Sequence, residues 1–274
     1  MDIRIVNTCN NNCLYCLEQP YRDKEKFVDK HLIFDEIFEN KIKNNIAFYW
    51  WNPLLHPDLW EIISFTKGAW YSGIWILTNT WWLDKKYLDL LVNRGLSSIW
   101  FYFHSFDRNI HNFVVNGWID FDDFMNNIKL ITDSWLFYKA IIHVNRQNIQ
   151  TLYRDIYILN KKYWVKNFEF INYFPFDRPY EKFRDLLEYD YNENKVYMDK
   201  LFKIIIELWL EVYFVKFSKD FFWDAMQFYD FEKWVLWQIW DEDILRLKTD
   251  IPFCLWEGRC KHCFIKDNCR LYGK

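Results

Sequence analysis

Short apolar segments alternate six times with longer amphipathic segments along most of this 274-residue chain. The apolar segments are bounded by turn residues, as expected of parallel strands that are buried on both faces. The longer segments carry apolar residues at helical spacing. Since the connections between parallel strands are right-handed, we expect the sheet to curl into a barrel or partial barrel with its functional site at the carboxyl ends of the strands. The predicted strands are residues 2–7, 46–49, 74–78, 98–103, 137–144 and 168–171, and the predicted helices are residues 31–44, 57–69, 84–93, 120–132, 148–163 and 192–208.

Seven cysteines are divided unevenly, with three near the start of the chain and four in the last 21 residues. Cys9, Cys13 and Cys16 follow the first apolar segment, with three and two residues between them. Three thiolates on one tight loop can hold three corners of a [4Fe-4S] cube, whose fourth iron stays open for another ligand. A partial zinc site is the alternative, although zinc prefers four ligands. With no signal peptide expected, these cysteines favour metal ligation in a reducing compartment over disulfides.

The Cys9, Cys13 and Cys16 spacing, with the aromatic Tyr15 before the last cysteine, resembles the radical S-adenosylmethionine (radical SAM) enzymes. The resemblance implies a (β/α)6 partial TIM barrel, which agrees with the six strand–helix units. It also implies that the open iron binds the amino and carboxylate groups of SAM. The reduced cluster would then cleave SAM to a 5′-deoxyadenosyl radical, with a reductant such as a ferredoxin or flavodoxin as the electron source.

Tryptophan is abundant and glycine is scarce in this sequence. The chain has 17 tryptophans and only 6 glycines, or about 2% glycine where about 7% is ordinary. Several tryptophans stand where a strand or helix should end in a left-handed turn, which favours glycine because glycine has no Cβ. We therefore predict that most of them are glycines in the native host, through a reading of UGA as Gly; a chain that is simply rich in tryptophan is the alternative. The positions are Trp50, Trp51, Trp81, Trp82, Trp135, Trp164 and Trp209.

Candidate SAM-binding residues follow the predicted strands. Trp50-Trp51-Asn52-Pro53 resembles the family's Gly-Gly-Glu-Pro segment if its tryptophans are read as glycine, with Asn52 in place of Glu. An asparagine carbonyl can still accept a hydrogen bond from the SAM amine. The resemblance also indicates Asn79 in Thr78-Asn79-Thr80 as part of the SAM site. Ser105 is a candidate contact for SAM or substrate, with His104 beside it either a second contact or a structural histidine. Asn145 is a candidate for the ribose or carboxylate. No general acid or base is identified.

The four cysteines near the end of the chain have five, two and five residues between them. Four thiolates in a compact loop suit either a zinc ion or a fully ligated [4Fe-4S] cluster, and spacing alone does not decide between them. The segment resembles the SPASM/twitch extensions of radical SAM enzymes, which hold auxiliary clusters, and four cysteines fit a single cluster of the twitch type. We therefore predict a core at residues 1–210 and a small cysteine-rich extension at residues 211–274. The predicted ligands are Cys254, Cys260, Cys263 and Cys269.

The composition excludes some partners. A net charge of −3 and an isoelectric point near 6.1, without a basic cluster, give no reason to expect nucleic-acid binding. No apolar run approaches 18 residues, so we expect no membrane span and a cytoplasmic protein. The resemblance predicts a radical SAM enzyme that abstracts hydrogen from a substrate, and a peptide or protein is the first candidate for that substrate. The alternatives are a small-molecule or RNA-base substrate, or a non-catalytic iron–sulfur or zinc protein that transfers electrons or serves as a scaffold.

Overall fold

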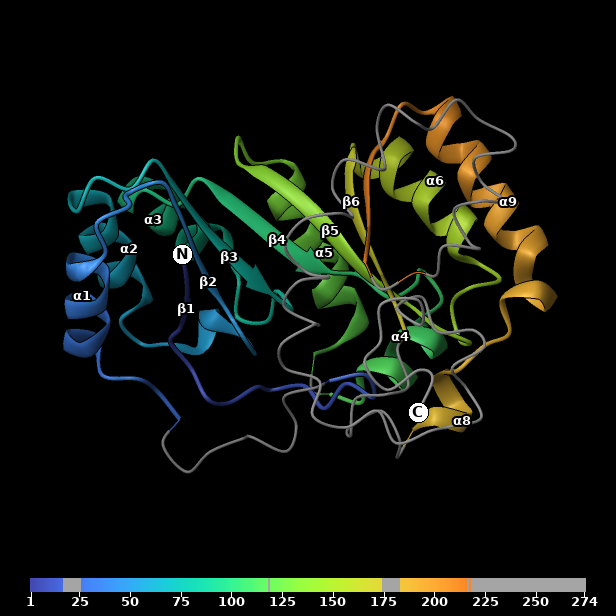
Figure 1. Cartoon of the computed structure of the whole chain (residues 1–274), viewed down its shortest axis with the longest axis horizontal. Coiled ribbons are helices and arrows are strands. Elements are labelled where there is room, and N and C mark those ends of the chain that lie inside the picture. The colour runs from blue at the N-terminus through green and yellow to red at the C-terminus, as the bar shows by residue number, and fades with distance from the viewer. Residues whose placement is uncertain (17–25, 118, 174–182, 216, 218–274) are drawn as a thin grey trace, which may run out of the picture.

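A computed structural model describes residues 1–16, 26–117, 119–173, 183–215 and 217. Its centre is one parallel sheet of seven strands in sequence order, β1 to β7 (Figure 1). Within the described residues no pairing joins β1 to β7, so the sheet is a partial barrel, as predicted. The strands are β1 (Asp2–Arg4), β2 (Asn45–Tyr49), β3 (Gly73–Thr78), β4 (Ser98–Tyr102), β5 (Phe137–Val144), β6 (Asn167–Asn172) and β7 (Glu211–Val215).

The helices cover one face of the sheet (Figure 1). Those between β1 and β4 pack on one another, as do α6 and α9 farther along the sheet. The structure adds α4, α8 and the 3-10 turn η2 to the predicted helices, and β7 continues the sheet at its far edge. The division into a core at residues 1–210 and an extension at residues 211–274 stays a prediction. The helices are α1 (Lys30–Glu39), η2 (Pro53–Leu55), α2 (Leu59–Gly68), α3 (Lys85–Arg94), α4 (Arg108–Val115), α5 (Phe121–Thr132), α6 (Leu152–Tyr163), α8 (Arg184–Leu187) and α9 (Tyr191–Glu207).

Strand residues alternate between two environments. Ile74 and Ile76 of β3 are fully buried in the apolar core, whereas Trp75 between them is less buried. Trp75 stacks on Trp100 of β4 with ring centroids 3.9 Å apart. The ammonium group of Lys139 on β5 lies 3.7 Å from the centroid of the Trp100 ring, so this second face of the sheet is aromatic and charged. Within the described residues no helix is long and apolar enough to cross a membrane.

The backbone is left-handed at six tryptophans, which are six of the eight non-glycine residues with positive φ among the described residues. Five of the seven tryptophans predicted at such turns have this conformation. Trp81 and Trp135 do not, and Trp70, which the sequence analysis did not single out, does. A residue with a Cβ pays about 1–2 kcal/mol for this conformation, so the pattern is unusual for tryptophan. The φ values are 73° at Trp50, 53° at Trp51, 70° at Trp70, 66° at Trp82, 60° at Trp164 and 51° at Trp209.

Candidate active site

The first three cysteines lie on a loop that leaves the carboxyl end of β1. Cys9, Cys13 and Cys16 are half-buried, and none of them is in a disulfide. Burial raises the pKa of Tyr102, at the end of β4, and the charges of Cys16, Glu169, Cys13 and Cys9 add to that rise. Within the described residues no three His, Cys, Asp or Glu side chains converge on a single metal ion. A cube does not require that convergence, because each thiolate binds a different iron.

The cysteine loop, residues 9–16, is held through its backbone by the end of α4. The Leu14 N–H donates to the carbonyl of Val114 (2.9 Å), and the Asn12 N–H donates to the carbonyl of Val115 (3.2 Å). The last carbonyls of a helix have no partner within the helix, so the loop satisfies groups that would otherwise be left open. Helix α4 therefore fixes the middle of the loop.

Three asparagines join the cysteine loop to the ends of β2 and β3. The side-chain amides of Asn52 and Asn79 both donate to Oδ1 of Asn10, at 3.2 and 3.0 Å. The Thr78 hydroxyl donates to Oδ1 of Asn52 (2.6 Å), and the Asn79 amide lies 3.6 Å from Sγ of Cys9. The structure thus brings together two residues predicted for the SAM site, and N–H donors next to a thiolate suit its negative charge.

The aromatic ring before the last cysteine is buried between the ends of β4 and β5. The Tyr15 hydroxyl hydrogen-bonds with Nε2 of His104 (3.2 Å), and the Tyr15 ring stacks on His143 with centroids 4.0 Å apart. Burial raises the pKa of Tyr15, with the Cys13 thiol adding to the rise, and burial lowers the pKa of His104. Both side chains are therefore neutral near pH 7.

Comparison with known families decides the class of this site. The sequence profile of the Radical SAM superfamily matches residues 3–156, which is more than half of the chain and includes the cysteine loop and the ends of β2, β3 and β4. The chain belongs to the radical SAM superfamily. It is an enzyme of that superfamily, and the family implies a [4Fe-4S] cluster and SAM as cofactors. Three cysteine thiols with neighbouring amide donors fit such a cluster.

Individual relatives resemble parts of this radical SAM enzyme. GTP 3′,8-cyclase of Chlorobaculum tepidum is 28% identical over 109 residues, which are 39% of this chain and 33% of the relative. SuiB of Streptococcus suis, solved with its precursor peptide SuiA, has a TM-score of 0.62 at 12% identity, covering 83% of this chain and 51% of SuiB. A spore photoproduct lyase variant has a TM-score of 0.54 at 16% identity, covering 78% and 75%. The chain spans a third of the cyclase and about half of SuiB, and the structural likenesses show the fold alone.

The segment after β2 lies beside the cysteine loop in this radical SAM core. Trp50 and Trp51 have left-handed backbone, and the guanidinium of Arg4 lies over both indoles, at 5.0 and 4.9 Å from their centroids. Pro53 begins η2 directly after Asn52. The four predicted residues therefore form one turn, and Arg4 packs against its two indoles.

Ser105 and Asn145 lie near the same edge, but both are occupied by hydrogen bonds within the protein, Ser105 to helix α6 and Asn145 to its own strand-end turn. Both are fully buried. The Ser105 hydroxyl donates to Oδ2 of Asp155 (2.8 Å). The Asn145 amide donates to the carbonyl of His143 (2.9 Å), and its oxygen accepts from the Gln147 N–H (2.9 Å). In this arrangement both side chains fix strand-end turns.

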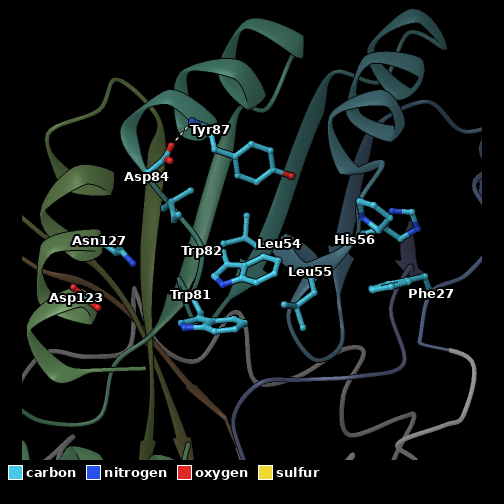
Figure 2. A pocket seen from close by; sticks show the side chains of 12 residues that line it. Phe27, Leu54, Leu55, His56, Trp81, Trp82, Asp84, Tyr87, Asp123 and Asn127 are labelled. Atoms are coloured by element: carbon cyan, nitrogen blue, oxygen red, sulfur yellow. Dashed lines mark hydrogen bonds between the residues drawn. The ribbon is translucent and has the colours of Figure 1, made fainter. Parts of the chain in front are cut away.

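A cavity of about 890 Å³ lies apart from the cysteine loop, beside η2 and the start of α3 (Figure 2). Figure 2 shows Leu54, Trp81 and Trp82 among its walls. His56 lies at its side, with its pKa lowered by burial. None of the cysteines or predicted SAM-binding residues lines this cavity. Two of its walls, Trp81 and Trp82, are among the tryptophans predicted to be glycine in the native host. We therefore do not assign the active site to it.

Sequence reasoning missed Asn10, Thr78 and the pair His104–His143 as partners of the cysteine loop. Asn10 lies between the cysteines, where its spacing carries no signal, and the other contacts join residues far apart in the chain. The predicted ligands Cys254, Cys260, Cys263 and Cys269 lie outside the described residues.

Proposed function

We propose that Cys9, Cys13 and Cys16 hold a [4Fe-4S] cluster and that SAM binds beside it. When bound and reduced, this pair supplies the 5′-deoxyadenosyl radical that abstracts hydrogen from a substrate. The observation that carries the proposal is the direct hydrogen-bonded link from the cysteine loop through Asn10 to Asn52 and Asn79. This link brings the ends of β2 and β3, where the family binds SAM, against the start of the cysteine loop at Cys9.

The proposed roles of the chain's own residues follow from their positions. Asn79 donates toward the Cys9 thiolate and keeps it negatively charged. Oδ1 of Asn52 accepts from the Thr78 hydroxyl, which fixes this side chain within the turn at residues 50–53, where we place the SAM amine. For Ser105 we propose contact with SAM or substrate, and for Asn145 contact with the SAM ribose or carboxylate. Each contact requires the side chain to give up one of its present hydrogen bonds.

We further propose that most of the tryptophans are glycine in the native host. The left-handed backbone at six of them supports this, since glycine adopts that conformation without strain. Exposure supports it as well: Trp70 and Trp209 leave 85% and 89% of their surface open to solvent. Glycine at 50 and 51 would bare the turn's backbone toward SAM. Peptide mass spectrometry of the protein from its native host tests this directly, and peptides with the masses of tryptophan at 50, 51 and 164 would refute it.

For the four cysteines near the end of the chain we propose a single auxiliary [4Fe-4S] cluster of the twitch type, with zinc as the alternative. The support is their number and spacing in a chain of this superfamily. Metal analysis after anaerobic reconstitution separates the two: about eight irons per chain indicates two clusters. About four irons with one zinc would remove the auxiliary cluster.

A peptide or protein is the substrate that we propose first. SuiB, solved with its precursor peptide, shares the fold over 83% of this chain. A small molecule is the second candidate, because the cyclase relative is named for GTP and is the more similar in sequence. We place the reaction in the cytoplasm, with a ferredoxin or flavodoxin as reductant.

Reductive SAM cleavage tests the proposed chemistry. The chain is prepared in two versions, as written and with glycine at the six left-handed tryptophans, and each is reconstituted anaerobically with iron and sulfide. We expect the reduced glycine version to release 5′-deoxyadenosine, and the Cys13→Ala variant to release none. Iron binding that depends on Cys13 without any SAM cleavage in either version would favour a non-catalytic iron–sulfur protein instead.

A further inference from the structure

The cysteine loop has an anchor that neither its cysteine spacing nor the asparagine link explains. Tyr15 lies between Cys13 and Cys16 along the chain, and its side chain leaves the loop to enter the protein, where only 6% of its surface is exposed. There it meets His104 beyond the end of β4 and His143 on β5. The ends of β4 and β5, which are far from Tyr15 in the sequence, therefore hold the part of the loop that carries two of the three cysteines.

The two histidines form a fixed receptor for this ring. The side-chain amide of Asn148 donates to the carbonyls of both His104 (3.2 Å) and His143 (2.9 Å), which ties the two strand ends together. Asn145 donates to the His143 carbonyl as well (2.9 Å). The exposed fractions of His104 and His143 are 3% and 8%. Since their backbones are tied together, a ring placed between them is oriented from both sides.

The bond between Tyr15 and His104 is a neutral hydrogen bond in a buried site. Such a bond contributes about 1 kcal/mol, and leaving one partner buried without it costs about 1–3 kcal/mol. Nδ1 of His104 is buried without a hydrogen-bond partner, so Nε2 makes the polar contact of this ring.

We propose that His104 is a positioning residue that acts through Tyr15 to keep Cys13 and Cys16 in place for the cluster. The loop then has three anchors: the asparagine link at Cys9, the end of α4 at Leu14, and His104 at Tyr15. The inference rests on the proposed function in one respect, which is that the cysteine loop holds an iron–sulfur cluster.

The test removes the hydrogen bond from each side and measures how firmly the cluster is held. Tyr15→Phe deletes only the hydroxyl, and His104→Leu deletes the ring that receives it. His111→Leu is the matched control, because His111 is 1% exposed and packs against His104 but does not touch Tyr15. Each variant is reconstituted anaerobically in the glycine version of the chain. The readouts are iron loss to a chelator and the electron paramagnetic resonance spectrum of the reduced cluster with and without SAM.

We expect Tyr15→Phe and His104→Leu to lose iron about five- to tenfold faster than the parent, as the loss of one buried hydrogen bond implies. The double variant should be no worse than either single variant, because both remove the same bond. His104→Gln, which keeps a hydrogen-bonding group, should restore most of the retention, and His111→Leu should match the parent. Among the single variants, only Tyr15→Phe and His104→Leu should change the spectrum of the reduced cluster.

The outcomes separate this inference from the proposed function. If the parent chain binds no iron that depends on Cys13, the proposed function fails. If the parent binds the cluster and His104→Leu retains iron and spectrum as His111→Leu does, the positioning role of His104 is refuted. Additive effects of Tyr15→Phe and His104→Leu would refute it as well, since they would show that the two side chains act separately.

Discussion

At the left-handed tryptophans, the backbone conformation alone sets the sign of the stability difference between a glycine and an alanine variant. Trp164 ends α6 with φ 60° and ψ 19°, and its N–H donates to the carbonyl of Asn160 (3.0 Å). Trp135 precedes β5, is fully exposed and is not left-handed. Comparing glycine with alanine at each position removes the contribution of the lost indole, because both replacements lack it. Only the Cβ differs between the two variants.

The expected free energies have opposite signs at the two positions. At Trp164 alanine keeps a left-handed Cβ, which costs about 1–2 kcal/mol, whereas glycine costs about 0.4–1 kcal/mol in unfolded-state entropy. Trp164→Gly should therefore be more stable than Trp164→Ala by about 1 kcal/mol. At Trp135 only the entropy difference remains, so Trp135→Ala should be more stable than Trp135→Gly by about 0.4–1 kcal/mol.

Thermal unfolding followed by circular dichroism measures the contrast. For a chain of this size, 1 kcal/mol corresponds to about 2–4 °C in the melting temperature. Trp209, with φ 51° and 89% exposure, is a second left-handed position that should follow Trp164. If alanine is as stable as glycine at Trp164 and at Trp209, the backbone does not require glycine there, and the structural support for glycine in the native protein is lost.

Three further predictions concern buried charge and a tight turn. Burial raises the pKa of Asp155 from 3.8 to about 6, so the folded state holds its proton more tightly than the unfolded chain does. Stability therefore falls as pH rises from about 4 to 6. Asp155→Asn should remove that fall, which is worth up to about 3 kcal/mol, in melting curves across this pH range. The buried Lys139 pairs with the partly exposed Glu169, with Nζ to Oε2 at 3.3 Å, so Lys139→Met should destabilise by about 1–3 kcal/mol in denaturant unfolding. Adding Glu169→Gln should recover most of the loss, and equal stability of the single and double variants would contradict this account. Gly95→Ala should destabilise the protein by about 1–2 kcal/mol, because Gly95 has φ +116° and a Cβ there would lie 2.9 Å from side-chain atoms of Lys67. An unchanged melting temperature would count against the left-handed turn.

The fold could be predicted from local patterns, because each strand is a short apolar run between turn residues. The run Ile74 to Thr78, for example, falls within β3 as the structure has it. Helix α4 was not predicted, although Asp107 accepts hydrogen bonds from the Asn109 and Ile110 N–H groups and an aspartate is a common residue at a helix start.

The candidate site was only partly predictable, and the reason is physical. Cys9 and Asn79 each follow a strand, and the carboxyl ends of parallel strands meet at one edge, so their closeness follows from the fold class. The bond of Tyr15 to His104 joins residues 89 positions apart, and it depends on side-chain orientations that no spacing rule gives. The missed Trp70 comes after Ala69, which caps the end of α2, and its neighbours Ala69 and Tyr71 gave no turn signal.

The left-handed tryptophans also bear on where this gene can work. If they are glycines in its own host, any cell that reads the same codons as tryptophan produces six strained turns, two of them at residues 50 and 51 beside the cysteine loop. The gene would then be functionally confined to lineages that share its code. Acquisition by another organism would yield a chain with its cysteines intact but with an indole at each of these six turns, so a steric requirement of the backbone would act as a barrier to horizontal transfer.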